Sequence, residues 1–170
     1  MTINKKVNEI KPERKIIAVG AIILSEDGKI LVIQETQDKP FVDKKAGDWG
    51  FPVETALPGE TIEENLKRLF AEEIGEIEVK YDLTSDWIGD YNGGNETKPL
   101  WGRVFLVHYK GRSDNGVSFR SVDGEVINHS WIFPREIFGL PRRKCVIEPI
   151  RNFIDNKRGV VCEKCSPGAR

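Results

Sequence analysis

The sequence lacks several features that would assign it to a specialised class of protein. Only three of its 170 residues are cysteines, and Cys145, Cys162 and Cys165 all fall near the end, which excludes the disulfide framework of a small secreted domain. No apolar run approaches the roughly 20 residues that a membrane helix requires. The first 15 residues contain no apolar segment typical of a secretory signal. We therefore expect a cytoplasmic protein without membrane association.

The chain also lacks an excess of charge of one sign. It has 26 Lys and Arg residues against 27 Asp and Glu residues, so the overall charge does not favour nucleic acid as a partner. The length and an apolar content of 39% suit a single domain with its own core. We expect this domain over residues 15–157, between a flexible N-terminal arm, residues 1–14, and a flexible C-terminal tail, residues 158–170. The Cys162 and Cys165 pair in that tail has the spacing of a metal knuckle but lacks clear further ligands, so metal binding stays open beside a simple flexible end.

Turn residues and β-branched runs indicate the order of the elements. Two such runs, residues 16–24 and 30–33, flank Asp27-Gly28, which predicts an antiparallel hairpin. A long polar loop follows at residues 36–48. Further strands are expected at residues 77–81, 87–91, 104–109 and 126–133, with a short helical turn at 134–138 and a last helix from Pro149.

One helix carries an unusual charge pattern. Thr61 and Glu64 form a capping box, and the segment that follows has no Gly or Pro until Gly75, which predicts a helix over residues 62–74. Glu73 falls inside the apolar stripe of this helix. A carboxylate in a core-facing stripe is costly unless it is paired or binds a cation. We therefore expect Glu73 to bind a cation, the alternative being that its side chain escapes to solvent as the last turn frays.

The same helix lies in a longer motif, which includes Gly59-Glu60, Arg68, Glu72-Glu73 and Gly75. These residues resemble the Nudix (MutT-like) box, whose pattern is G-x5-E-x7-R-E-U-x-E-E-x-G-U with U an apolar residue. The box covers residues 54–76, and the hairpin before it and residues 131–137 after it extend the resemblance over residues 15–157. The resemblance implies an α+β fold, a Nudix-type α/β/α sandwich with a mixed β-sheet between helices.

The resemblance also implies an activity. A Nudix hydrolase cleaves a diphosphate linkage in a nucleoside diphosphate linked to another moiety, with Mg²⁺ or Mn²⁺ as cofactor and a metal-activated water. Glu72, Glu73 and Glu60 are the implied metal-binding residues, and Arg68 is expected to pair with Glu60. The implied catalytic residues are Glu72, Glu73, Arg68 and, as the base that activates the water, Glu125, with Asp123 and Glu54 as alternatives.

Three residues depart from the motif. Leu69 stands where the family has a glutamate that commonly binds metal or acts as base, Glu54 replaces the opening glycine, and Glu76 stands at the closing apolar position. A leucine can neither coordinate a cation nor accept a proton. A second hypothesis therefore stays open, in which the chain is a catalytically weak or inactive Nudix-fold module that binds a nucleotide or a protein.

The substrate site is outlined only by residue type. Trp49 and Trp87 are candidates for stacking on a base and Arg103 for pairing with phosphate, although aromatic residues on strands also belong to cores. Tyr91, Trp101 and Arg120 are further candidates. The basic run at residues 142–144 is interpreted as a solvated patch, with phosphate contact as the alternative. A homodimer is compatible with the sequence.

Overall fold

The computed structural model describes residues 14–39, 44–75, 77–115, 119, 121 and 126–164, without the side chains of Ile127 and of residues 157–164. Most of the expected arm and the end of the expected tail lie outside these residues. So do several residues singled out from the sequence: Glu76, Arg120, Asp123, Glu125, Cys165 and the side chain of Cys162.

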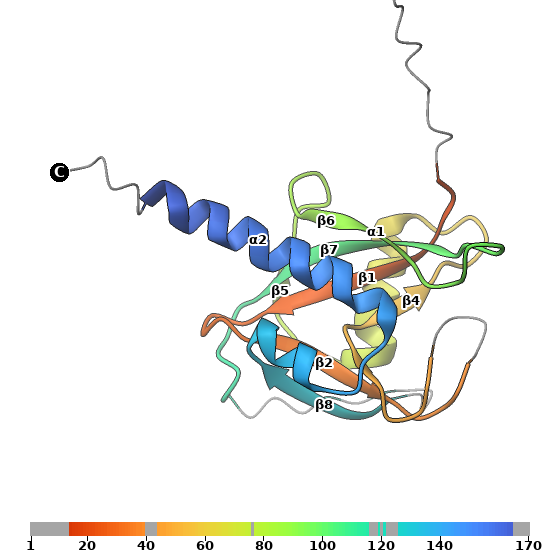
Figure 1. Ribbon diagram of the computed structural model, residues 1–170, viewed down its shortest axis with the longest axis horizontal. Helices are drawn as coiled ribbons and strands as arrows, with labels where there is room; N and C mark the ends of the chain where they lie inside the picture. Colours follow the sequence, from red (N-terminus) through yellow and green to blue (C-terminus); the bar gives the residue numbers. More distant parts are fainter. Residues whose placement is uncertain are drawn as a thin grey trace, which may run out of the picture.

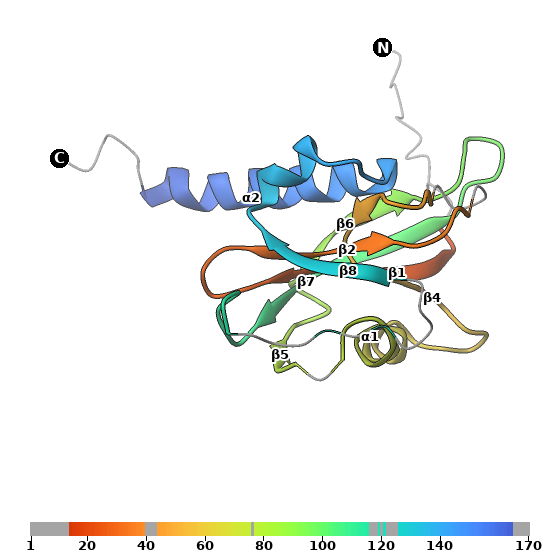
Figure 2. The ribbon, with the colours of Figure 1, turned by 90° about the horizontal axis from the view of Figure 1, so that it is seen from below.

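The described residues fold into three layers, with one mixed sheet of eight strands between two helices, α1 and α2 (Figures 1 and 2). Helix α1 (Ile62–Leu69) covers one face of the sheet, and helix α2 (Ile147–Lys164) covers the other. The strands are β1 (Ile16–Leu24), β2 (Ile30–Glu35), β3 (Trp49–Gly50), β4 (Val53–Thr55), β5 (Val79–Lys80), β6 (Trp87–Asn92), β7 (Trp101–Tyr109) and β8 (Val126–Ile132). The expected α/β/α sandwich with a mixed sheet is confirmed.

Strand β1 lies at the centre of the sheet. It pairs antiparallel with β2, through Leu24 and Ile30, and with β4, and it pairs parallel with β7. The predicted hairpin is therefore confirmed. Both faces of β1 are covered, which explains why its sequence is a continuous apolar run and not an alternating one.

Two apolar clusters lie on the two faces of the sheet. On the α1 face, Leu66, Leu69 and Ile74 pack against β1 and β7. On the α2 face, Ile150 and Phe153 pack against a separate set of strand residues. Leu69, the residue at the implied glutamate position, is fully buried in the first cluster, so its side chain serves packing.

Several boundaries differ from those predicted. The capping box at Thr61 is present, but α1 ends at Leu69 and continues as a π-helical turn, η2 (Phe70–Ile74), in which the Gly75 amide donates to the Phe70 carbonyl at 2.8 Å. Strand β7 starts at Trp101, three residues before the predicted start.

The C-terminal part of the fold follows the expected order with longer helical segments. The predicted short turn is the 3-10 helix η3 (Pro134–Gly139), and a second one, η4 (Lys144–Val146), leads into α2. Helix α2 begins at Ile147 and continues to Lys164, so residues 158–164 of the expected tail are helical. In the described part of the chain, no helix combines the length and apolar composition needed to cross a membrane.

Candidate active site

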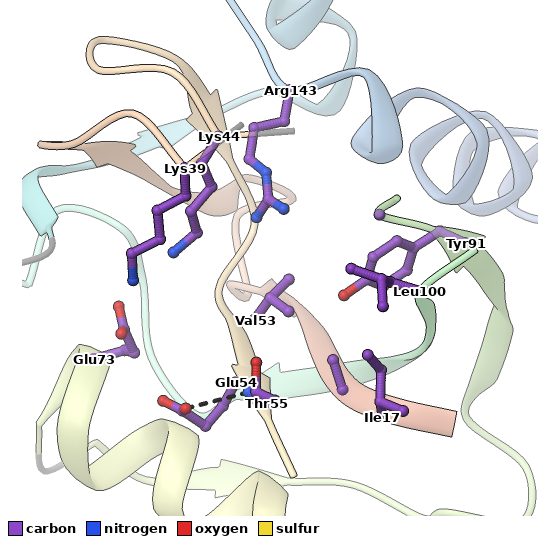
Figure 3. A pocket seen from close by; sticks show the side chains of 12 residues that line it. Ile17, Lys39, Lys44, Val53, Glu54, Thr55, Glu73, Tyr91, Leu100 and Arg143 are labelled. Atoms are coloured by element: carbon purple, nitrogen blue, oxygen red, sulfur yellow. Dashed lines mark hydrogen bonds between the residues drawn. The ribbon is translucent and has the colours of Figure 1, made fainter. Parts of the chain in front are cut away.

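A pocket of about 300 Å³ lies where β1 and β4 approach the last turn of the α1 segment. It brings together residues that are far apart in the sequence (Figure 3). The lining residues are Ile17, Ala18, Lys39, Lys44, Val53, Glu54, Thr55, Glu73, Tyr91, Gly93, Leu100 and Arg143.

Glu73 points into this pocket and not into bulk solvent. Its residue is 4% exposed, and its carbonyl oxygen accepts a hydrogen bond from Nε2 of His129 at 2.8 Å. Burial lowers the pKa of His129, and its ring stacks on Phe119. The strand β8 thus holds the end of η2, where helical carbonyls have no partner within the helix. The alternative of a frayed last turn with a solvated Glu73 is wrong.

Arg68 is the centre of a charge cluster on the helix side of the pocket. Its guanidinium lies 2.8 Å from Glu60, 3.0 Å from Glu54 and 3.4 Å from Glu72. We call these four residues the Arg68 cluster. A further bond from Arg68 to the Thr55 carbonyl, at 2.5 Å, ties α1 to β4. The sequence correctly predicted that Arg68 pairs with Glu60.

The carboxylates of the Arg68 cluster differ in environment. Hydrogen bonds from Arg68 and from the Leu57 amide lower the pKa of Glu60 to about 2. Burial raises the pKa of Glu54, although Arg68 opposes the rise. Glu54 lines the pocket, whereas Glu60 and Glu72 do not, so a role of Glu60 in metal binding stays a prediction.

The opposite side of the pocket is cationic. Lys39, Lys44 and Arg143 extend into it from one side, while Glu54 and Glu73 face them from the other (Figure 3). We call the first three residues the cationic wall and the last two the acidic wall. In Figure 3 the ends of the Lys39 and Glu73 side chains point toward one another.

A buried carboxylate anchors the cationic wall. Glu35 is 3% exposed, and its carboxylate lies 3.3 Å from Lys44 and 3.8 Å from Arg143. We call Glu35, Lys44 and Arg143 the Glu35 cluster. Arg143 is itself only 3% exposed, so the interpretation of residues 142–144 as a solvated patch is wrong at this position. Glu35, Lys39 and Lys44 were not predicted from the sequence as residues of the site. The one available signal was the position of the acidic residue Glu35 at the end of the apolar strand β2.

Tyr91 places a hydroxyl group in the pocket. The residue is 4% exposed, and burial raises the pKa of its hydroxyl, so the group is protonated and able to donate. Of the aromatic residues considered from the sequence, Tyr91 alone lines the pocket among those the structure describes.

The residues predicted to bind substrate lie elsewhere. Trp87 and Arg103 line a second hollow of about 150 Å³, where Arg103 pairs with Asp90 at 2.9 Å and lies over the Trp87 ring. Trp49 packs against the core on the α2 face. Arg14 covers the Trp101 ring at 3.9 Å. None of these candidates lines the described pocket that contains Glu73. The roles of Trp49, Trp87, Trp101 and Arg103 in substrate binding therefore stay predictions.

The carboxylates of the pocket suit a divalent cation only in an open site. Among the described residues, no three His, Cys, Asp or Glu side chains are grouped closely enough to enclose a metal. Mg²⁺, however, is commonly held by one or two carboxylates, with water and substrate phosphates completing its shell. The acidic wall supplies two such carboxylates on one pocket, both largely removed from water, so the residues fit an open site of that kind.

Comparison with known proteins gives the family. The model of the NUDIX domain family matches residues 14–155. This chain belongs to the NUDIX domain family. Members of this family are generally pyrophosphohydrolases that use a divalent metal. A search of curated proteins found no match to this chain.

Solved structures agree on the fold. A NUDIX hydrolase from Nitrosomonas europaea is 20% identical, with 84% of this chain and 91% of that chain covered and a TM-score of 0.62. A C. elegans Ap4A hydrolase is 16% identical, with 85% and 99% covered and a TM-score of 0.64. The NUDIX domain of Shewanella oneidensis NrtR, in complex with ADP ribose, is 13% identical, with 92% and 99% covered and a TM-score of 0.57. At these identities the likeness establishes the shared NUDIX fold.

Proposed function

We propose that this NUDIX protein hydrolyses a diphosphate linkage in a nucleoside diphosphate linked to another moiety, and that the reaction takes place in the pocket lined by Glu73. One observation carries the proposal: an acidic wall and a cationic wall face each other across a single pocket. A diphosphate requires neutralisation of its oxygens on both phosphoryl groups, and this arrangement has cations on one side and carboxylates able to recruit a metal on the other.

The acidic wall is the proposed metal side. Glu73 would hold Mg²⁺ or Mn²⁺, with Glu72 as a second donor after a change of side-chain conformation. The metal, when bound, supplies charge neutralisation and lowers the pKa of a coordinated water. Burial of Glu73 supports this assignment, since a buried carboxylate has most to gain from a cation.

Glu54 is the base that the described residues favour. Its raised pKa makes it a better proton acceptor than an ordinary glutamate, because a catalytic base works best when its pKa approaches the operating pH. Arg68 orients its carboxylate at 3.0 Å. Glu125, the base implied by the family resemblance, lies outside the described residues, as does Asp123.

Leu69 supports the competing proposal of a weak or inactive binding module. Its side chain is fully buried against the sheet, so the helix offers packing where the motif implies a third acid. The acidic wall and the Arg68 cluster favour hydrolysis with a reduced set of acids.

A substrate panel tests the proposal. Wild type and Glu73→Gln would be incubated with Mg²⁺ and a range of nucleoside diphosphate derivatives and dinucleoside polyphosphates, with product release followed by chromatography. We expect turnover by wild type and a loss of at least about a hundredfold in Glu73→Gln. Glu63→Gln, an exposed acid on the same helix paired with Lys67, is the matched control and should retain activity. Wild type that cleaves nothing in the panel would favour the binding module.

Metal binding is tested separately from turnover. Mg²⁺ or Mn²⁺ should raise the Tm of wild type and of Glu63→Gln, because a ligand that binds only the folded state stabilises it. Glu73→Gln should lose this response. An equal rise in all three proteins would count against the acidic wall as the metal site.

A further inference from the structure

We propose that His129 is a positioning residue, which directs the Glu73 carboxylate into the pocket by holding the Glu73 backbone from the neighbouring sheet. The inference rests on the proposed role of Glu73 in metal binding. It adds to that site a residue that lies outside the helical motif, on strand β8, and that does not itself line the pocket.

A hydrogen bond between two layers of the fold joins His129 to Glu73. Nε2 of His129 lies 2.8 Å from the backbone carbonyl oxygen of Glu73, although the two residues are 56 positions apart in the sequence. A carbonyl oxygen can only accept a hydrogen bond, so Nε2 carries the proton and donates it. The bond therefore ties the end of the η2 turn to the sheet.

The Glu73 carbonyl depends on a donor from outside its own helix. The backbone leaves the helical conformation at Gly75, where φ is 98°, and the last carbonyls of a helix find no amide ahead of them within it. The Gly75 amide already donates to Phe70. Because His129 fixes the peptide group that follows Glu73, it also fixes the direction in which the Glu73 side chain leaves the backbone toward the pocket (Figure 3).

The imidazole ring is itself held in place. It stacks on Phe119, with ring centroids 5.1 Å apart. Trp131, which follows two residues later on the same face of β8, lies 5.9 Å from Phe119 and stacks on Tyr109 at 5.4 Å. A donor on a ring that packs in this way holds its acceptor in one direction, as residues behind a metal ligand commonly do.

Two substitutions at position 129 test this role. Gln and Met have unbranched side chains of similar length, but only Gln ends in a group that donates a hydrogen bond. We expect His129→Met to bind Mn²⁺ about tenfold more weakly than wild type, which is the usual effect of changing a residue that orients a metal ligand. His129→Gln should recover most of this affinity. Binding of Mn²⁺ alone to the full chain is measured by EPR.

His108→Met is the matched control. His108 is the second of the two histidines in the sequence and is exposed on β7, so this variant should bind Mn²⁺ like wild type. Equal weakening in His129→Met and His129→Gln would overturn the proposal, because the effect would then come from the loss of the ring and not of the donor. Unchanged affinity in His129→Met would overturn it as well.

A measurement on wild type applies even if His129→Met does not fold. In protein with isotope-labelled histidine, the Nε2 resonance of His129 should shift when Mg²⁺ saturates the site, because the carbonyl that it contacts belongs to the metal-binding residue. The spectrum of His108→Met, which retains one histidine, assigns the resonance. A resonance that stays unchanged at saturation contradicts the proposal.

Kinetics distinguish a positioning role from a general loss of structure. Where wild type turns over a substrate of the panel, His129→Met should lower kcat and leave KM close to its wild-type value, because the cationic wall is not altered. An increase in KM with unchanged kcat would contradict the role of His129.

This inference and the proposed function fail in different ways. Mn²⁺ binding that requires a donor at position 129, in a protein that cleaves nothing in the panel, would remove the hydrolase and support the role of His129. Turnover that depends on Glu73, with equal Mn²⁺ affinity in wild type and His129→Met, would support the hydrolase and remove the role of His129.

Discussion

The Arg68 cluster and the Glu35 cluster have opposite arrangements of charge. In the first, one guanidinium lies within 3.4 Å of three carboxylates; in the second, one carboxylate lies within 3.8 Å of two cations. The first cluster contains more carboxylates than cations, and the second contains more cations than carboxylates. The difference indicates that the pocket between them is polarised, with surplus negative charge on the α1 side and surplus positive charge on the other.

The two clusters also differ in burial. The side chains of Glu35 and Arg143 are both 4% exposed, whereas Arg68 is 20% exposed and Glu72 is 38% exposed. Charges that are fully withdrawn from water depend more strongly on their partners. The Glu35 cluster should therefore be the more sensitive of the two to the loss of its central residue.

Glu35→Gln should have the largest effect. The change leaves Arg143 and Lys44 with less negative charge beside them in a buried environment, and we expect the free energy of unfolding to fall by about 3 kcal/mol. Urea denaturation measures this loss. If Glu35→Gln lowers the free energy of unfolding by less than Arg68→Met, the expected order of sensitivity of the two clusters is wrong.

Arg68→Met should have an intermediate effect of about 2 kcal/mol on the free energy of unfolding, because it leaves three carboxylates close together but partly open to water. The same denaturation experiment applies. Arg68→Lys should recover only part of the loss, since an ammonium cannot reproduce the fork that bonds Glu60 through two nitrogens.

The pH dependence should separate two acids within the Arg68 cluster. The pKa of Glu60 is lowered from 4.5 to about 2, so its contribution to stability is present above pH 4.5 and is lost as the pH falls toward 2. The destabilisation caused by Glu60→Gln should therefore shrink across this window. The pKa of Glu54 is raised, so its contribution is present below 4.5 and is lost as the pH rises, and Glu54→Gln should show the opposite trend.

Lys67→Ala should have the smallest effect. Lys67 pairs with Glu63 at 3.5 Å on the surface of α1, with both side chains more than half exposed. Such a pair contributes less than about 0.5 kcal/mol. A larger change in the denaturation midpoint would show that solvent exposure does not rank the ion pairs of this protein.

The elements with strong local signals could be predicted from the sequence. The hairpin around Asp27-Gly28 and the capping box at Thr61 depend on residues that are near one another in the chain, and both are present in the structure. The pairing of Arg68 with Glu60 followed from the spacing of a motif. Glu73 was recognised because its charge conflicts with the apolar stripe around it.

The cationic wall could not be predicted in the same way. Lys39 and Lys44 lie in a polar loop, and Arg143 lies in a basic run, and these segments are typical of solvent-exposed surface. Lys44 and Arg143 are placed by their pairing with Glu35 and by the packing of β2 near η4, which join residues about a hundred positions apart. Lys39 is placed by its backbone hydrogen bonds with Lys44. Tyr91 was one of several aromatic candidates, and its place in the pocket depends on the space above Gly102 on the neighbouring strand β7.

The π-helical turn at Phe70–Ile74 affects how this segment tolerates changes in length. A turn closed by a bond from Gly75 back to Phe70 contains one residue more than an ordinary α-helical turn. Deleting Ala71 would allow the same two backbone groups to bond as a regular helix, so the chain would lose no hydrogen bond. The Glu73 residue would nevertheless rotate relative to β8, and its backbone carbonyl would lose the hydrogen bond from His129. The extra residue therefore sets the direction of the Glu73 carboxylate and is not needed for the continuity of the helix.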